Sequence, residues 1–161
     1  MKRFALCSLA AGCVILAAAC AAYAEGDAVR SYGIRAGYSD GPDQFVIGAQ
    51  ADMGSIWRRV HFVPSIDAGF GNDLTTICFN GDIQAFLPMP KSSFSLYGLA
   101  GPTIMYWSPE VGDGETDIGV SLGGGVRAAF GDKGWYNLEA RVGIGDVPDF
   151  RILFGVFLGG R

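Results

Sequence analysis

The sequence has little cysteine and histidine from which a catalytic or metal centre could be built. Cys7, Cys13 and Cys20 lie in an apolar N-terminal stretch, so Cys78 is the one cysteine beyond it, and His61 is the one histidine. A lone exported thiol either pairs between molecules or, as we favour, is a small packed residue. We see no cofactor motif and no metal-ligand spacing, and we expect neither a cofactor nor a metal centre.

Long apolar runs and helical spacing are also missing after residue 24. No segment there repeats apolar residues at helical intervals over three turns, and no linker, charge block or repeat divides the chain. A length of 137 residues after position 24 is that of one domain. The sequence therefore predicts a single all-β domain.

Basic residues are few in that domain. Without Lys2 and Arg3 it has 10 Lys and Arg against 16 Asp and Glu, a net charge of −6. Nucleic-acid binding proteins need a basic patch that neutralises phosphates. We therefore expect no nucleic-acid partner.

The N-terminus has the features of an export signal. Lys2 and Arg3 precede an apolar stretch over residues 4–22, and Ala-Tyr-Ala at 22–24 fits the small-x-small rule for cleavage before Glu25. We predict a signal peptide at residues 1–24 and a barrel domain at 25–161. A transmembrane anchor and lipidation at Cys20 or Cys13 are the alternatives.

Short segments of alternating apolar and polar residues fill the rest of the chain, each closed by Gly, Asp, Asn or Pro. Side chains alternate between the two faces of a strand, so such segments predict strands. The expected strands cover residues 31–39, 44–54, 60–70, 75–87, 94–107, 117–130, 135–145 and 150–158, with turns at 55–59 and 131–134 and the longest loop at 108–116. Pro64 and Pro102 fall inside strands, where we expect bulges.

The two faces of these strands differ sharply. We assign one face to lipid; it comprises Tyr32, Ile34, Ala36, Tyr38, Phe45, Ile47, Ala49, Ala51, Phe62, Pro64, Ile66, Ala68, Phe70, Ile77, Phe79, Ile83, Ile118, Val120, Leu122, Val126, Leu138, Ala140, Val142, Phe150, Ile152, Phe154 and Val156. The other face carries many glycines and a polar set that we expect to form a paired network in the lumen: Arg35, Gln50, Asp67, Asp82, Asp117, Arg127, Glu139, Arg141 and Arg151. Buried charges persist only when they are paired.

A soluble lipocalin-like barrel or sandwich would show the same alternation with the faces exchanged. Two observations favour the membrane version. Glycines share the polar face, where a narrow interior needs space, and aromatic residues gather at the strand ends as in interfacial girdles. One rim comprises Tyr38, Phe45, Phe70, Tyr106, Trp107 and Phe150; the other comprises Trp57, Phe62, Phe94, Tyr97, Phe130, Trp135 and Tyr136. We predict a closed antiparallel up-and-down barrel of about eight strands, filled by side chains, with a narrow pore as the alternative.

Three segments carry a family resemblance. YGIRAGYS at 32–39, FVPSIDAGFG at 62–71 and LEARVG at 138–143 look like the small outer-membrane β-barrel proteins of Gram-negative bacteria, the group of the OmpA-like transmembrane domain, OmpX-like and opacity-type proteins. The resemblance implies outer-membrane localisation, periplasmic termini, and outer-membrane lipid, lipopolysaccharide and the barrel-assembly machinery as partners. Such barrels commonly end in an aromatic residue, whereas this chain ends in FLGGR; Phe157 is the nearest substitute.

With periplasmic termini, the outer loops would be acidic. They would carry Asp40, Asp43, Asp73, Glu110, Asp113, Glu115, Asp146 and Asp149, while Arg58, Arg59, Lys91 and Lys133 would lie in the periplasmic turns. Oxygen ligands of this kind could hold Ca²⁺ or Mg²⁺ at the outer loops. The alternative is ordinary Asp-Gly turn chemistry, because no spaced calcium-loop motif is present.

Catalysis has little support in the sequence. Ser65 lies four residues after His61 on a predicted strand, roughly 13 Å away at about 3.3 Å per residue, which is too far for a serine–histidine hydrogen bond. A serine from a neighbouring strand is the remaining alternative. We expect a non-enzymatic outer-membrane barrel with a structural, envelope-integrity or surface-interaction role. The alternative is a soluble periplasmic barrel that binds an apolar ligand.

Overall fold

The computed structural model describes residues 29–71, 74–89, 92–109, 114–131 and 134–159. The predicted signal peptide at 1–24 lies outside these residues. No helix among the described residues is long and apolar enough to cross a membrane.

Nine antiparallel strands make up the described chain. They are β1 (Ser31–Asp40), β2 (Gln44–Asp52), β3 (Ser55–Trp57), β4 (Val60–Gly71), β5 (Leu74–Phe86), β6 (Phe94–Pro109), β7 (Glu115–Phe130), β8 (Gly134–Gly145) and β9 (Phe150–Leu158). Eight of them, all except β3, are 9 to 16 residues long. That length suits a tilted strand that crosses a bilayer, which needs roughly 9 to 11 residues.

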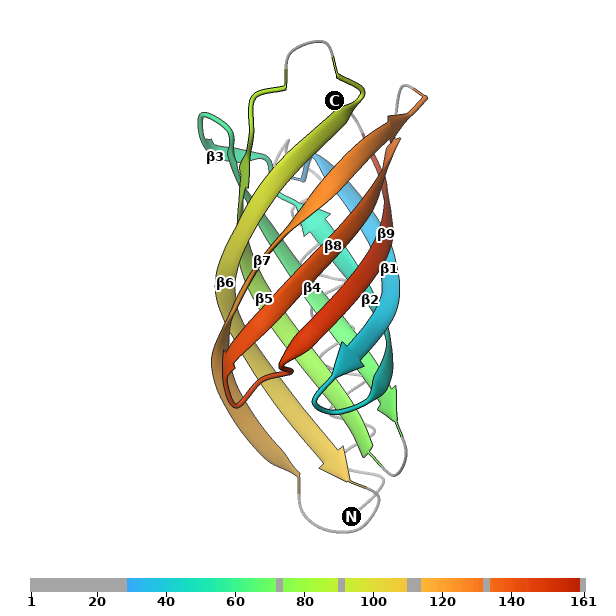
Figure 1. The fold of residues 1–161 in the computed structure, drawn as a ribbon, viewed down its shortest axis with the longest axis vertical. Coiled ribbons are helices and arrows are strands. Elements are labelled where there is room, and N and C mark those ends of the chain that lie inside the picture. Colours follow the sequence, from blue (N-terminus) through green and yellow to red (C-terminus); the bar gives the residue numbers. More distant parts are fainter. Residues whose placement is uncertain (1–28, 72–73, 90–91, 110–113, 132–133, 160–161) are drawn as a thin grey trace.

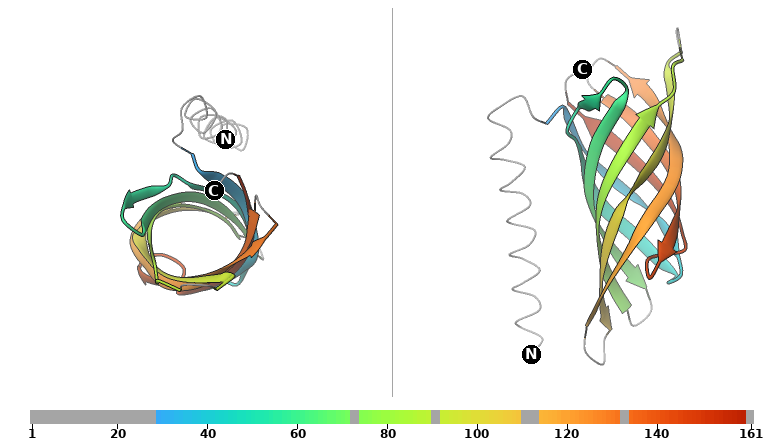
Figure 2. Two further views of the ribbon diagram at one scale, coloured as in Figure 1. Left: turned by 90° about the horizontal axis from the view of Figure 1, so that it is seen from above. Right: turned by 90° about the vertical axis from the view of Figure 1, so that its left-hand side faces the viewer.

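These eight strands close into a barrel. Each pairs with its neighbours along the chain, β1 pairs with β9, and β2 pairs with β4, which leaves β3 as a side branch. The strands wind steeply around a common axis, and the view along that axis shows an uninterrupted ring (Figures 1 and 2). The predicted closed up-and-down barrel of eight antiparallel strands is confirmed.

Side chains alternate across the barrel wall. Ile34 and Ile118 point outward with 70% and 69% of their surface exposed, whereas Arg35 points inward with 2% exposed. The outward residues are almost all apolar, so the interior holds the charges. The lipocalin-like arrangement, with the apolar side chains inside and the charged ones outside, is therefore not the arrangement of this chain.

The strand boundaries required several corrections. Residues 55–57, predicted as part of a turn, form β3 and pair with the start of β4, and β2 ends at Asp52 rather than at residue 54. The predicted loop at 108–116 is shorter, because β6 continues to Pro109 and β7 begins at Glu115. These two long strands extend the barrel wall on one side.

Neither proline that we predicted to cause a bulge shifts the strand register. Pro64 pairs with Gly81 in a continuous β4–β5 ladder, and it lies just beyond Ser65, the last β4 residue paired with β2. Its missing N–H is therefore not needed by β2. Around Pro102 the β5–β6 pairing is interrupted but resumes in the same register.

Several residues assigned to the outer face or the girdles lie elsewhere. Tyr97 is 3% exposed and points inward, and Trp107 and Trp135 contact interior groups instead of lipid-facing ones. Ala51 and Ile77 are buried, although their strand positions have the outward phase. Phe157 also points inward, so the last outward side chain of β9 is Leu158.

The two ends of the barrel differ in charge. The acidic end carries Asp40, Asp43, Glu115, Asp146 and Asp149 in or beside its hairpins. The basic end carries Arg30, Arg58 and Arg59, beside β3 and the last residues of β9; it is the upper end in Figure 1. The predicted loop residues Asp73, Lys91, Glu110, Asp113 and Lys133 lie outside the described part of the chain.

The close approach of β5 and β6 can be tested with two glycines of one strand. A Cβ on Gly101 would lie 2.8 Å from the Asp82 Cα, whereas the nearest atom to a Cβ on Gly98 is 3.9 Å away. We expect Gly101→Ala to lower the free energy of unfolding by about 1–3 kcal/mol, the usual cost of overpacking. Gly98→Ala should lower it by less than about 0.5 kcal/mol. Urea unfolding of the two refolded variants compares them, and equal midpoints would contradict this packing.

Candidate functional site

The barrel interior holds a chain of six alternating charges. Arg141 contacts both Asp82, at 2.9 Å, and Glu139; the Glu139 carboxylate lies 3.5 Å from Arg35; and Asp67 lies 2.6 Å from Arg35 and 3.4 Å from Arg151. We call this set the six-charge chain: Asp82, Arg141, Glu139, Arg35, Asp67 and Arg151. All six side chains are at most 2% exposed. Their charges come from β1, β4, β5, β8 and β9, so the chain crosses the interior.

Arg35 is the most extensively bonded member. Its Nε and Nη2 donate to the two carboxylate oxygens of Asp67 at 2.7 and 2.6 Å. Nη2 also donates to Ser65 at 2.7 Å, and Nη1 donates to Gln50 at 3.4 Å. The two-pronged contact with Asp67 matches the planar guanidinium to the carboxylate and fixes their relative orientation. Arg35 therefore ties β1 to β2 and β4.

Neutral side chains connect the six-charge chain to the remaining strands. Arg151 Nη2 donates to Ser121 at 3.0 Å and to Asn80 at 3.2 Å. Thr103 on β6 donates to Asn80 at 3.0 Å and shares a 2.8 Å hydrogen bond with Ser121 on β7. Tyr97 donates to Glu139 at 2.8 Å. Every one of the eight barrel strands thus contributes at least one side chain to the same network.

A second ion pair lies nearer the basic end. Arg127 donates to Asp52 and to Gln84, each at 2.7 Å. Its guanidinium also lies 4.6 to 5.6 Å from the centres of four aromatic rings, those of Phe86, Tyr97, Trp135 and Phe157. Cation–π contacts of this kind favour a charge at the ring face. The four rings and Asp52 together hold Arg127 in place.

Eight of the nine residues that we expected in the lumen are buried inside the barrel, and the ninth, Asp117, is partly buried near the acidic end; the nine do not form one network. Seven of them, Arg35, Gln50, Asp67, Asp82, Glu139, Arg141 and Arg151, are linked directly or through a partner. Arg127 belongs to the separate pair with Asp52. Asp117 contacts no arginine among the described residues; it accepts a hydrogen bond from Trp107 near the acidic end.

Sequence reasoning missed several interior residues. Asp52 was not assigned to the lumen, yet it bonds Arg127, the His61 ring and the Gly54 amide. The sequence could have indicated this position, because Asp52 lies two residues after Gln50 on β2 and so points to the same, inward face. Tyr97, Asn137 and Thr103 also lie inside, and Tyr97 Oη is 2.7 Å from Asn137. Tyr97 and Trp135 were predicted as girdle residues because they lie at strand ends, but their strand phase directs them inward.

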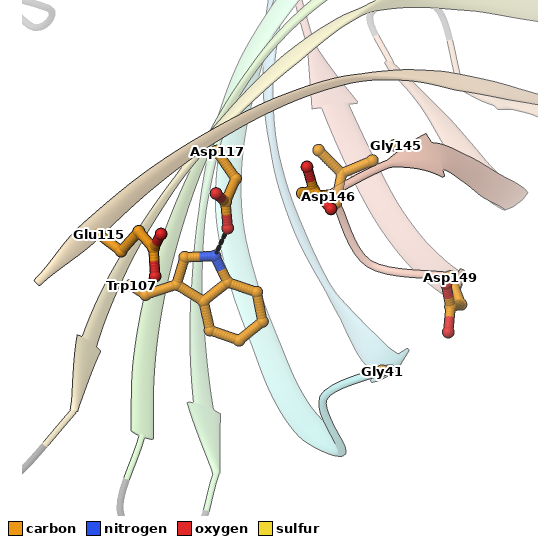
Figure 3. Close-up of a pocket in the computed structure, with 8 residues that line it drawn as sticks. Gly41, Trp107, Glu115, Asp117, Gly145, Asp146 and Asp149 are labelled. Carbon is orange, nitrogen blue, oxygen red and sulfur yellow. Dashed lines mark hydrogen bonds between the residues drawn. The ribbon is translucent and has the colours of Figure 1, made fainter.

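The acidic end opens into a cavity of about 500 Å³. Its lining includes Glu115 and Asp117 from β7, Trp107 from β6, and Asp146 and Asp149 from the β8–β9 hairpin. Figure 3 shows the Trp107 indole next to Glu115 and Asp117, with its N–H toward the Asp117 carboxylate, and Asp146 and Asp149 across from them. No three His, Cys, Asp or Glu side chains of the described residues are grouped closely enough to hold a metal ion.

The basic end opens into a larger cavity of about 1040 Å³, which we call the basic-end cavity. Three arginines line it, Arg30, Arg59 and Arg127, together with His61 and Asp52. The rest of the lining combines Ser92, Ser93 and Ser95 with Phe86, Leu87, Pro88, Met89, Ala129, Gly131 and Trp135. One end of the barrel is thus lined mainly by carboxylates and the other mainly by cations and apolar groups.

His61 is not arranged for nucleophilic catalysis with a serine. Its Nδ1 lies 2.9 Å from the Asp52 carboxylate. Ser65 is engaged with Arg35 and Asn80, and Ser55, which pairs with His61 across β3 and β4, donates to the Arg58 carbonyl oxygen. No serine hydroxyl among the described residues forms a hydrogen bond with His61, whereas an activated serine needs such a base.

Comparison with solved structures identifies the same architecture in outer-membrane proteins. Neisserial surface protein A superposes with a TM-score of 0.66 at 13% identity, over 80% of this chain and 94% of that one. The N-terminal β-barrel domain of Pseudomonas aeruginosa OprF gives 0.64 at 12% identity, over 81% and 97%. Yersinia pestis outer membrane protein Ail gives 0.51 at 11% identity, over 80% and 97%.

The fold does not decide between enzyme and non-enzyme. PagL, an outer membrane enzyme, also matches, with a TM-score of 0.50 at 11% identity over 81% of this chain and 99% of that one. No protein-family model matches the chain, and no curated protein matches its sequence. The chain therefore has the fold of the small outer-membrane barrels, the group that the sequence resembled.

The six-charge chain predicts a specific stability defect. Asp82 has one charged partner among the described residues, Arg141. Arg141→Leu should therefore leave Asp82 buried and unpaired and lower the free energy of unfolding by about 3–5 kcal/mol, because an uncompensated buried charge is costly. Arg58→Leu, which removes an exposed arginine, should change it by less than about 0.5 kcal/mol.

A second substitution separates lost charge pairing from lost packing. Adding Asp82→Asn to Arg141→Leu removes the uncompensated charge, so we expect the double variant to be more stable than the single one in urea unfolding. Additive losses from the two substitutions would show that Arg141 acts through packing alone.

Proposed function

We propose that this protein is a non-enzymatic outer-membrane barrel whose interior is a hydrogen-bonded plug. Its role is structural or concerns surface interaction, in the maintenance of the envelope or in contacts at the cell surface. The observation that carries the proposal is the combination of an apolar outer wall with a charge-paired interior linked to all eight barrel strands.

The outer wall supports an environment of lipid. The largest exposed apolar side chains point away from the barrel on every barrel strand, among them Ile34, Phe45, Phe70 and Ile118. In water so much exposed apolar surface on a monomer would drive aggregation or association. In a bilayer the same surface is the lipid-facing band of a barrel. Outer-membrane lipid is accordingly the first partner we propose.

The two ends support an orientation. We place the basic end in the periplasm, where the resemblance to small barrels puts the chain termini, and the acidic end outside the cell. Asp40, Asp43, Asp146 and Asp149 would then face lipopolysaccharide, with divalent cations such as Ca²⁺ or Mg²⁺ between the two sets of anions. Insertion would use the barrel-assembly machinery, and it would have to tolerate Leu158 as the last outward side chain of β9.

The interior supports a plug rather than a pore. Four arginines and four carboxylates, Asp52, Asp67, Asp82 and Glu139, are buried between the strands and bonded to one another. Eight strands enclose a space just wide enough for side chains to fill. An ion crossing this space would have to separate buried charge pairs, which is energetically costly.

The first test asks whether the barrel is inserted in the outer membrane. After expression of the full chain in a Gram-negative host, we expect it in the outer-membrane fraction, with mobility on SDS gels that changes on boiling. The closed barrel resists SDS until heat unfolds it. The Gly101→Ala variant, destabilised within the wall, should lose its folded band at a lower temperature than Gly98→Ala. Recovery of the wild-type chain in the soluble periplasm would overturn the proposed location.

The second test separates plug from pore. Purified barrel reconstituted into planar lipid bilayers should give no stable conductance steps, because the six-charge chain blocks the interior. An established porin, reconstituted in the same way, provides the positive control. Reproducible single-channel steps from the heat-modifiable wild-type barrel would contradict the plug.

A further inference from the structure

We propose that the basic-end cavity binds an anionic amphiphile, a molecule with a carboxylate or phosphate head group joined to an apolar chain. This binding function goes beyond the structural role proposed above, because a plugged barrel needs no ligand at its mouth. The proposal rests on the charge, the hydrogen-bonding groups and the apolar wall of this cavity.

The charge of the cavity is positive. Arg30 and Arg59 are exposed at its edge, and Arg127 lies at its inner end with 7% of its surface exposed. Asp52 is the one carboxylate among the described lining residues. It already accepts hydrogen bonds from Arg127 and the Gly54 amide and contacts His61. Its charge is therefore satisfied within the barrel, and the two edge arginines have no carboxylate partner among the described residues.

The polar groups that remain at the inner end are donors. Arg127 Nε and Trp135 Nε1 are buried and have no hydrogen-bond acceptor among the described residues. The same holds for Gln84 Nε2; the oxygen of this Gln84 amide accepts a hydrogen bond from Arg127. A buried donor without an acceptor is unfavourable. An anion in the cavity would supply acceptor oxygens to such groups, whereas a cation would supply none.

The wall of the cavity adds an apolar surface. Phe86, Leu87, Pro88 and Met89 follow one another along the end of β5 and the segment after it, and Trp135 lies at the start of β8. The Leu87 and Met89 side chains are 57% and 40% exposed. The cavity therefore has an apolar wall, in contrast to the polar interior that holds the six-charge chain. A free inorganic anion would leave this surface in contact with water. A molecule that is both anionic and apolar would use both halves of the cavity.

The test follows the indole N–H signal of Trp135 in the full barrel. The chain has three tryptophans, so ¹⁵N-labelled protein in phosphatidylcholine nanodiscs gives three indole peaks, and Trp135→Phe identifies the one at the cavity. Decanoate should shift this peak saturably. Decanol, with a similar chain but no charge, and inorganic phosphate, with charge but no chain, should each shift it at least tenfold less at the same concentration.

Two exposed arginines on one hairpin provide matched variants. Arg59 lines the cavity, whereas Arg58, beside it, lies against the Trp57 ring. Arg30→Gln combined with Arg59→Gln should weaken decanoate binding about three- to tenfold, since charge-assisted bonds to the head group are lost. The strand hydrogen bonds at these positions use backbone atoms, Arg30 N and Arg59 O, so the fold should be retained. Arg58→Gln should bind decanoate like the wild type.

The following results would overturn the proposal. They are a Trp135 peak that decanoate does not move, an equal response to decanol or to phosphate, or an equal loss of affinity in Arg58→Gln. Any of them would leave the plug untouched, because the plug is judged by conductance and by the stability of the Arg141 variants.

Discussion

The structure depends on one constraint, that charges enclosed by the barrel wall must be paired. Arg141 and Arg151 are directly opposite each other in the β8–β9 register, and both point inward. Two like charges at such a position are unfavourable by themselves. They coexist because Glu139 and Asp82 form ion pairs with Arg141, and Asp67 forms one with Arg151. The carboxylates of β4, β5 and β8 are therefore needed for β8 and β9 to pair in this register.

The same constraint explains why the barrel is closed in one way. Arg35 on β1 contacts Asp67 on β4, although these strands are not neighbours, and β2 lies between them. Gly48 of β2 pairs with both residues, and a Cβ added there would meet the Asp67 carboxylate. A residue without a side chain is thus required at this position of β2, because the Arg35–Asp67 ion pair lies against it. The strand register and the interior ion pairs therefore depend on each other.

Much of this arrangement could be predicted from the sequence, because the side chains of a strand alternate between its two faces with a period of two residues. Alternation at Ile34, Arg35 and Ala36 assigns each residue to a face once a strand is assumed, and the same logic placed Asp67, Asp82, Glu139 and Arg151 inside. Partners could not be predicted, because they depend on the stagger between strands. Asp117 was expected to pair with an arginine, yet it accepts a hydrogen bond from Trp107. The carboxylate that pairs with Arg127 is instead that of Asp52.

Aromatic residues were the main source of error, and the physical reason is that they are favourable on both faces. Outside, Tyr136 and Phe154 stack on each other on neighbouring strands of the wall. Inside, Trp135 and Phe157 stack in the same way and cover the Arg127 guanidinium. Hydrophobicity does not distinguish these two pairs; strand phase does.

The inward pair gives Arg127 a low-polarity surrounding in which its contact with Asp52 is strong. This aromatic-covered ion pair lies at the inner end of the basic-end cavity, while the six-charge chain occupies the middle of the interior. The Arg127–Asp52 pair and the six-charge chain share few partners, so loss of one should leave much of the other in place.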